Sequence, residues 1–362
     1  MSISTVAPTS GTASIAFVDC EISAGAGPSS GGGVHAHAHR RWEVVIAGKR
    51  IKTVDVHAHC IVPDAAKLIN HPLEAPALLW SNAGDRLAHM DKSGVDVEAL
   101  SINPFWYRAE RDAAEQLIKV QNETLVEFCA GHPDRFVGFA TAALQFPDLA
   151  AQQVEHAVKN LGFRGVGVAG SVAGEELANP KFHPFWAKCE ELGVLVFMHP
   201  LGTRELEPSG RLAGSGLLTN TIGNPLETTI ALSHLIFEGT LDRFPGLKIC
   251  AAHGGGYLPS YADRSDHACL VGPKGCNSEI KLKKKPTEYL KQIWFDSLIF
   301  SPEAIRHLVA QVGSSQIVVG SDYPYPWQMA PVDHIFASTS LSDEEKADIL
   351  GRTAAKLFGM SA

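Results

Sequence analysis

The chain has 362 residues, of which 45% are hydrophobic and 19% are charged, enough apolar material for one large domain or two ordinary ones. Its formal net charge is -8, from 31 Lys and Arg against 39 Asp and Glu, and its basic residues form no long stripe, so nucleic acid is not an expected partner. No apolar stretch approaches the roughly 20 residues that a membrane-spanning helix needs, so no membrane partner is expected either.

The first part of the chain is rich in Ser, Ala, Gly and His, a composition that does not bury enough surface to fix a backbone. The run "FVDCEI" (17–22) could still add a short strand to the main body. The run "RWEVVIAGKRIKTVDV" (41–56) reads as two strands around the turn "AGKR" (47–50). We therefore divide the chain into a flexible extension with short strands, residues 1–50, and a main domain, residues 51–362.

Apolar runs rich in β-forming residues then alternate with helical segments. The expected strands cover residues 53–57, 95–102, 136–144, 165–170, 194–199, 248–253, 293–298 and 317–322. The expected helices cover residues 86–92, 113–130, 148–161, 182–192, 225–243, 302–312 and 343–358. Near-continuous apolar strands are typical of a parallel sheet that is covered on both faces. The pattern predicts an α/β fold, the (β/α)8 TIM barrel, rather than an open doubly wound sheet, for which a glycine fingerprint or a Walker loop is missing.

Histidines and one aspartate stand at the carboxyl ends of four expected strands. His57 and His59 end the first strand, His199 the fifth, His253 the sixth and Asp322 the eighth. In a barrel these ends meet at the active-site face. Four imidazoles and a carboxylate form a donor set suited to zinc or a similar divalent ion. The pattern therefore predicts a metal site, although spacing alone does not separate His253 from a fifth ligand.

Two other segments bear on this metal site. The fourth expected strand ends in "GVGVAGS" (165–171), which offers no Lys, Glu or Asp to bridge a second ion, so we expect a single ion. A second His-x-His run, from His35 to His39, lies in a glycine-rich tract, where an ion would have to immobilise the chain. We expect these histidines to be exposed and at best an adventitious site.

Side chains near the other strand ends have less definite roles. Asp296, near the end of the seventh strand, either orients a ligand or bonds to neighbouring backbone. Phe105, Trp106 and Tyr107 follow the second strand and either line a pocket or close the top of the barrel.

Seven cysteines are scattered through the chain without a CxxC pair. An odd number without paired spacing argues against a disulfide framework and fits a reducing compartment. We expect each cysteine to be a small buried side chain. The first 34 residues carry no Lys or Arg, so the positive start of a signal peptide is missing and we expect a cytoplasmic protein.

From Val54 to about Gly359 the sequence resembles the amidohydrolase superfamily, and within it the branch of aminocarboxymuconate semialdehyde decarboxylase. The resemblance rests on "DVHAH" (55–59), "HP" (199–200), "AHGGG" (252–256) and "GSDYPYP" (320–326). The His-x-His and Asp motifs mark the superfamily, whereas the triple glycine and "DYPYP" indicate the narrower branch.

The resemblance implies a role for each of the strand-end side chains. His57, His59, His199 and Asp322 would ligate the ion, and His253 would transfer a proton together with Asp322. A histidine suits this role because its ordinary pKa lies close to neutral pH.

Two arginines extend the resemblance to substrate binding and assembly. Arg86 in "DRLAHMDKSGV" (85–95) and Arg264 in "PSYADRSDHA" (259–268) fall where that decarboxylase has arginines for its dicarboxylate substrate. In the family the second arginine is donated by a neighbouring subunit. The resemblance therefore implies a homodimer.

Together these features predict a metal-dependent nonoxidative decarboxylase of a small unsaturated or aromatic carboxylic acid, muconate semialdehyde-like or hydroxybenzoate-like. The expected cofactor is one divalent ion, zinc before manganese. The alternative is a metal-dependent hydrolase or hydratase of a related ring-cleavage product, with Asp322 as base, because the fold alone does not decide the reaction. A non-catalytic metal-binding protein is a third possibility, and the intact set of ligands with acid/base and anion-binding residues argues against it.

Overall fold

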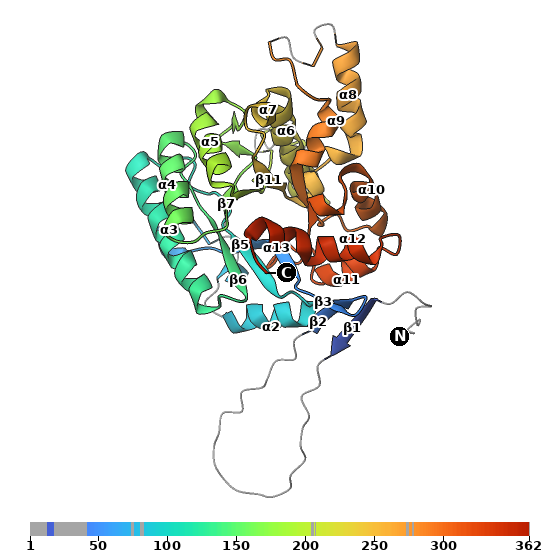
Figure 1. The fold of residues 1–362 in the computed structure, drawn as a ribbon. Coiled ribbons are helices and arrows are strands. Elements are labelled where there is room, and N and C mark those ends of the chain that lie inside the picture. Colours follow the sequence, from blue (N-terminus) through green and yellow to red (C-terminus); the bar gives the residue numbers. More distant parts are fainter. Residues whose placement is uncertain are drawn as a thin grey trace, which may run out of the picture.

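The computed structural model describes residues 13–17, 42–73, 76–79, 83–203, 206, 208–272, 275–276 and 279–361. Eight parallel strands form one sheet in the order β13-β12-β11-β10-β7-β6-β5-β4 (Figure 1). The strands are β4 (Val54–His59), β5 (Val97–Ser101), β6 (Phe136–Ala140), β7 (Gly165–Val168), β10 (Leu195–Met198), β11 (Lys248–Ala251), β12 (Ile293–Asp296) and β13 (Ile317–Val318). All eight expected strands are therefore present.

The sheet closes on itself between its first and last strands. Parallel bridges join Asp55 to Val319 and Ala58 to Tyr323, so β4 pairs with the chain that leaves β13. The structure confirms the predicted (β/α)8 barrel. Closure matters for the site, because it brings the carboxyl ends of β4 and β13 side by side although they are more than 250 residues apart.

Helices surround the barrel, and most of them pack on its outside (Figure 1). They are α1 (Pro63–Lys67), α2 (Ala83–Ser93), α3 (Arg111–Gly131), α4 (Pro147–Lys159), α5 (His183–Leu192), α6 (Asn224–Phe237), α7 (Thr240–Arg243), α8 (Ala262–Val271), α9 (Pro286–Tyr289), α10 (Pro302–Val312), α11 (Pro331–Phe336), α12 (Asp343–Ala347) and α13 (Thr353–Phe358). In α10 the buried side chains are Ile305, Leu308 and Val312, which form one apolar stripe against the barrel.

Two of the expected helices are interrupted. The segment 225–243 divides into α6 and α7 at Gly239, whose φ of 72° lies in the left-handed region. The segment 343–358 forms α12 and α13 with one π-helical turn, Asp348–Arg352, between them.

A small antiparallel sheet precedes the barrel and consists of β1 (Ala13–Phe17), β2 (Trp42–Ile46) and β3 (Lys49–Ile51). The predicted short N-terminal strands are thus confirmed, but β1 ends where the expected strand 17–22 was to begin. Between β2 and β3, Ala47 and Gly48 have φ values of 49° and 75°, as tight hairpin turns require. Residues 18–22 and the run His35 to His39 lie outside the described residues.

Two cysteines beyond the barrel form a disulfide. Cys269, near the end of α8, is bonded to Cys276, seven residues further along the chain. The expectation of a small buried side chain is wrong for this pair. Among the free cysteines of the described residues it holds for Cys60, Cys189 and Cys250, whereas Cys129 is only half-buried. The helix α8 projects from the body of the barrel (Figure 1).

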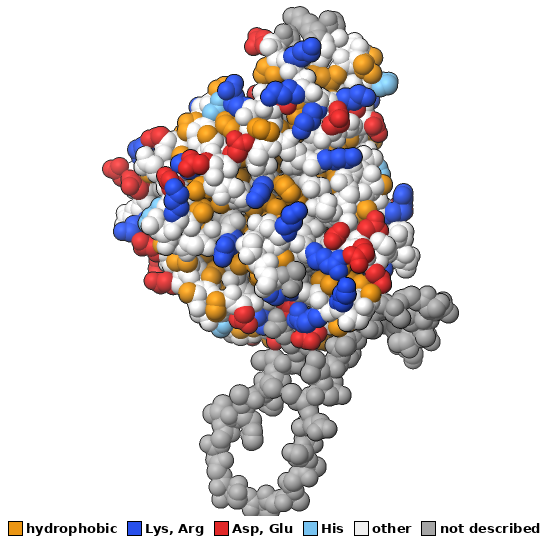
Figure 2. Space-filling view, viewed as in Figure 1, with side chains coloured by type: hydrophobic (Ala, Val, Ile, Leu, Met, Phe, Trp, Pro, Cys, Tyr) orange, Lys and Arg blue, Asp and Glu red, His pale blue; other side chains and the backbone are white. Residues whose placement is uncertain are grey.

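Charges of both signs are interspersed over the face seen in Figure 2, with no stripe of one sign. Within the described part of the chain, no helix is both long enough and apolar enough to cross a membrane.

Candidate metal centre and active site

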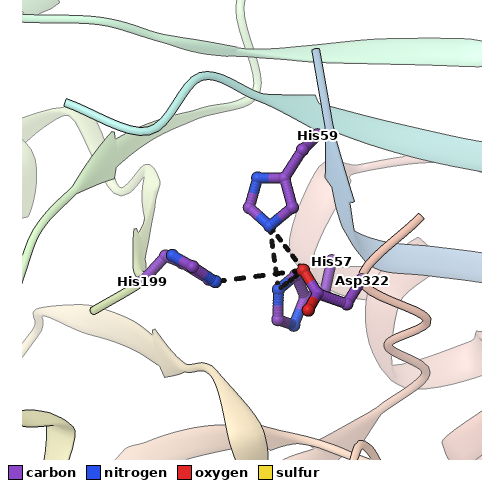
Figure 3. Close-up of side chains that lie close together, drawn as sticks. All are labelled: His57, His59, His199 and Asp322. Atoms are coloured by element: carbon purple, nitrogen blue, oxygen red, sulfur yellow. Dashed lines mark hydrogen bonds and ion pairs between the residues drawn. The ribbon is translucent and has the colours of Figure 1, made fainter. Parts of the chain in front are cut away.

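Four side chains converge at the carboxyl end of the barrel and point toward one another (Figure 3). His57 and His59 end β4, His199 follows β10, and Asp322 follows β13. One potential ligand atom of each lies within 4.8 Å of the others, and all four residues are buried. The structure thus brings together the four side chains that the sequence predicts as ligands.

The shortest distances are those among the two histidines of β4 and the aspartate. Nε2 of His57 lies 3.0 Å from Nε2 of His59. Oδ1 of Asp322 lies 2.9 Å from Nε2 of His59 and 3.1 Å from Nε2 of His57. Nε2 of His199 lies 4.0 Å from the same oxygen.

This donor set fits a divalent cation. Nδ1 of His57 lies 2.6 Å from Oδ2 of Asp296, so a neutral His57 ring that ligates an ion would keep its proton on Nδ1 and turn the lone pair of Nε2 toward the cluster. Both ring nitrogens of His199 are buried and have no hydrogen-bond partner among the described residues. Lone pairs and a carboxylate this close repel unless a positive charge lies between them. Three imidazole nitrogens and one carboxylate oxygen therefore form a metal-binding site.

The pKa shifts lead to the same conclusion. Burial lowers the pKa of His57, but the carboxylates of Asp322 and Asp296 outweigh this effect and raise the pKa to about 10. Burial raises the pKa of Asp322, yet His57 and His59 hold it far below its usual range. Burial and the neighbouring imidazoles lower the pKa of His199 well below its ordinary value, which keeps this ring neutral and able to ligate. The buried carboxylates thus favour one positive charge in the cluster, which is the extra proton of His57 in the protein without an ion and which a bound metal ion would replace.

Backbone strain is found at two of the predicted site residues. Asp322 has a φ of 65° and His253 a φ of 55°, in the left-handed region that residues other than glycine rarely adopt. Such a conformation costs about 1–3 kcal/mol and needs compensating contacts. One of these is the hydrogen bond from the Asp322 N–H to the His57 carbonyl, at 2.8 Å. Strain held in place at these two positions supports a functional role for both.

His253 lies beside the metal-binding cluster rather than within it. Its ring centroid is 5.1 Å from that of His57 and 5.2 Å from that of His199. Burial, with repulsion from His57, lowers the pKa of His253 to about 4, so the free imidazole is neutral. Its Nδ1 has no hydrogen-bond partner among the described residues. A titratable ring is thus placed next to the ion site with a nitrogen available.

The three glycines after His253 are required by close packing. Gly254, Gly255 and Gly256 have φ values of 61°, 77° and 66°. A Cβ on Gly256 would lie 2.1 Å from the carbonyl oxygen of Pro225. Only glycine readily adopts these φ values and lets the backbone of Pro225 come this close, which explains the "HGGG" motif.

Asp296, at the end of β12, fulfils both roles that the sequence left open. Besides its bond to His57, Oδ2 accepts the N–H of His253 at 2.9 Å, and Oδ1 accepts the N–H of Gly254 at 2.8 Å. Burial raises its pKa, but the contact with His57 outweighs this and lowers it, so the group is an acceptor. One carboxylate therefore orients a metal ligand and the predicted acid/base residue.

Replacing Asp296 by Asn should lower the affinity for a divalent ion about 10–100-fold, because the amide fixes the His57 tautomer less well. The affinity is measured on the metal-free protein by competition with a chromophoric chelator. Asp148→Asn, an exposed carboxylate paired with Arg111, is the control and should bind the ion normally. Equal affinities in the two variants would contradict this orienting role.

Two further carboxylates that support the site were missed by the sequence interpretation. Asp55 accepts the N–H of His57 at 3.0 Å and bonds the hydroxyl of Ser321, so it joins β4 to the residue before Asp322. Its place two residues before His57, on the same face of the strand, was an available signal. Glu227 of α6 accepts the N–H groups of Leu201 and of Gly202 at 2.6 Å each and so holds the loop after His199.

The two predicted substrate arginines lie in different surroundings. Arg86 of α2 is buried, and its guanidinium bonds to Glu98 and to the His59 carbonyl. Arg264 lies on α8 and is exposed. Neither belongs to the cluster of ligand atoms, and their substrate roles stay predictions.

A cavity of about 420 Å³ opens beside this end of the barrel, with His71, Asn103, Phe105, Tyr107 and Glu227 in its wall. A much smaller cavity shares His71, Asn103 and Phe105 with it and also contacts His59. Of the three aromatic residues after the second strand, Phe105 and Tyr107 line the larger cavity, whereas Trp106 is fully buried.

Comparisons of the sequence and of the structure with known proteins agree on one family. Residues 54–360 match the family model described as Amidohydrolase. The chain is 31% identical over 278 residues to 2-amino-3-carboxymuconate-6-semialdehyde decarboxylase of Dictyostelium discoideum, covering 76% of each chain. It is 29% identical over 291 residues to gamma-resorcylate decarboxylase of Rhodococcus jostii (strain RHA1), covering 75% of this chain and 86% of that protein. The crystal structure of 5-carboxyvanillate decarboxylase from Sphingomonas paucimobilis superposes with a TM-score of 0.77 and 25% identity, covering 86% of this chain and 100% of that one.

Proposed function

The chain belongs to the amidohydrolase family, and from this premise we propose that it is a metal-dependent nonoxidative decarboxylase of a small unsaturated or aromatic carboxylic acid. The observation that carries the proposal is the placement of His253 against a buried cluster of three imidazoles and one carboxylate. The names of the three related proteins above support the reaction class, and two of them are named for hydroxylated aromatic acids.

The reaction replaces the carboxylate of the substrate by a proton. A bound divalent ion supplies positive charge that holds and polarises substrate oxygens. His253 delivers the proton to the carbon atom that carries the leaving carboxylate. The bond between that carbon and the carboxylate then breaks, CO2 departs, and the electron pair of the broken bond stays on the ring or chain.

His253 must be protonated before it can act as this acid. Its pKa of about 4 belongs to the protein without an anionic substrate. A substrate carboxylate beside the ring favours the imidazolium and raises this pKa toward neutrality. His253 then recovers its proton from solvent after each turnover.

The proposed ion is zinc, with manganese as the alternative, because nitrogen-rich sites with one carboxylate suit both. The metal content of the purified protein, measured by mass spectrometry, identifies it. A cytoplasmic location stays a prediction from composition.

The reaction is tested by incubating the metal-loaded protein with muconate-type and hydroxybenzoate-type acids and measuring CO2 together with uptake of solvent 18O. Evolved CO2 with unlabelled product is expected. Labelled product without CO2 would identify a hydrolase or hydratase instead. Binding of the ion without turnover of any acid in the panel would favour a non-catalytic protein.

We also propose that the protein is a homodimer in which Arg264 completes the site of the neighbouring subunit. Tyr261, Leu270 and Val271, on α8 and just before it, are 68%, 79% and 75% exposed. Large apolar side chains that are exposed at both ends of a projecting helix support burial against a second copy of the chain. The mass in solution, measured by light scattering, tests the dimer.

Replacing Arg264 by Ala should raise KM about 10-fold or more and leave the bound ion in place. A charged hydrogen bond to a carboxylate is worth about 1.5–3 kcal/mol, which sets this magnitude. Arg306→Ala, an exposed arginine paired with Glu303 on α10, should have unchanged kinetics. An Arg264 variant with the KM of the unmodified enzyme would remove this residue from the proposed site.

A further inference from the structure

We propose that Arg86 is a positioning residue that holds two ligand-bearing segments of the metal centre together, rather than a residue that binds substrate. This inference rests on the proposed metal-dependent function. Nη2 of Arg86 donates a hydrogen bond to the backbone carbonyl of His59 at 2.6 Å. The same guanidinium lies over the ring of Tyr323, 4.7 Å from its centroid. His59 is a proposed ligand, and Tyr323 directly follows another, Asp322.

Arg86, His59 and Tyr323 form a closed set of contacts, which we call the Arg86 triangle. The N–H of His59 donates to the carbonyl of Tyr323 at 2.6 Å, and the carbonyl of His59 accepts from Arg86. The ring of Tyr323 in turn covers the guanidinium. The backbone of His59 is therefore held on both sides at the end of β4. This position fixes how far its imidazole lies from the carboxylate of Asp322.

The charge of Arg86 is already neutralised inside the protein. Arg86 and Glu98 are 3% and 1% exposed, and Nη1 of Arg86 lies 2.7 Å from Oε2 of Glu98. An unpaired guanidinium would be strongly disfavoured at this depth, and Glu98 of β5 supplies the opposite charge. A substrate carboxylate would have to displace this partner. Arg86 thus has the contacts of a buried structural ion pair that acts on the site through the backbone.

Metal sites are sensitive to such support, because ligands must be held within about half an ångström of the geometry that the ion prefers. Without Arg86, backbone hydrogen bonds alone would hold the end of β4 to the segment that carries Asp322, and the position of His59 would be less tightly fixed. Ion affinity and coordination geometry would change first. Substrate affinity at saturating metal would change little.

The experiment replaces the buried ion pair as a unit, because removal of Arg86 alone would leave the Glu98 charge unpaired. The double variant Arg86→Met, Glu98→Leu fills the space with apolar side chains, an exchange that buried ion pairs often tolerate. A second variant, Arg86→Lys, keeps the charge opposite Glu98 but cannot reproduce the forked contact to both Glu98 and the His59 carbonyl. The matched control is Arg135→Met, Asp91→Leu, which removes another buried pair, with a distance of 2.8 Å.

Three measurements decide the role of Arg86. Zinc affinity, measured by competition with a chromophoric chelator, should fall about 10–100-fold in the double variant, less in Arg86→Lys, and not in the control. The visible spectrum of the cobalt-substituted protein, which reports ligand geometry, should change in the same order. KM at saturating metal should change less than about 3-fold, since no direct substrate contact is lost.

The proposal would be overturned if whichever Arg86 variant folds kept the zinc affinity and the cobalt spectrum of the unmodified protein but raised KM about 10-fold or more. Arg86 would then be a substrate-binding residue. Unchanged values of all three quantities would overturn it as well. Zinc affinity and the cobalt spectrum need no turnover. A protein without decarboxylase activity would therefore refute the proposed function and still decide the role of Arg86.

Discussion

Replacing His57 by Ala should abolish retention of the metal ion. The imidazole lies at the centre of the cluster, with Nε2 within 3.1 Å of both His59 and Asp322 and Nδ1 bonded to Asp296. The variant loses one ligand and leaves two buried carboxylates without the positive charge between them. Metal content after dialysis, measured by mass spectrometry, should fall to the level of the buffer.

The same substitution should also lower stability. Removing one partner of a buried charge pair costs about 3–5 kcal/mol of unfolding free energy, so the variant should unfold at a lower denaturant concentration. His199→Ala separates the two effects, because its ring has no hydrogen-bond partner among the described residues and its loss leaves no such contact broken. That variant should lose the ion with a smaller loss of stability.

The control is His37→Ala, in the other His-x-His run of the sequence, and its metal content should match that of the unmodified protein. Loss of the ion in this control, together with its retention by His57→Ala, would show that the metal site lies in the run from His35 to His39 and not at His57 and His59. Retention by both variants would rule out His57 as an essential ligand.

The barrel and the convergence of the strand-end side chains could be predicted because both depend on short-range patterns, whereas the choice of His57, His59, His199 and Asp322 as ligands came from the family resemblance. Most strand residues are buried, and β4, β5, β7 and β10 are buried along their whole length, so their apolar character is visible in the sequence itself. The ligands stand at strand ends, and barrel closure brings those ends together whatever the details of the helices. A correct count of strands therefore sufficed to place His57, His59, His199 and Asp322 near one another.

The features that the sequence did not reveal depend on contacts between distant residues or on weak patterns. Asp296 bonds to His57 across 239 residues, and no local spacing shows this pair. The helix α8 buries only Ala262 and so has no apolar stripe, which explains why it was not expected. The disulfide between Cys269 of α8 and Cys276 was not indicated by cysteine spacing alone.

Replacing His253 by Asn should lower kcat about 10²–10⁴-fold, the contribution typical of a positioned general acid, while the ion stays bound. An asparagine can keep the backbone hydrogen bond to Asp296, because that bond uses the N–H of residue 253. Its amide N–H groups are far too weakly acidic to transfer a proton to carbon. Asparagine also tolerates the left-handed conformation found at this position better than most residues, so the fold should persist.

The metal content of this variant answers the question that spacing left open. Because the structure places the His253 ring beside the cluster and not within it, we expect His253→Asn to bind its full complement of the ion and to lose turnover. If ion and activity were lost together, His253 would be a fifth ligand. If kcat were unchanged, the proton would come from another group. The control is His156→Asn on the exposed face of α4, which should keep both the ion and kcat, so a loss in His253→Asn alone reflects its position beside the metal centre.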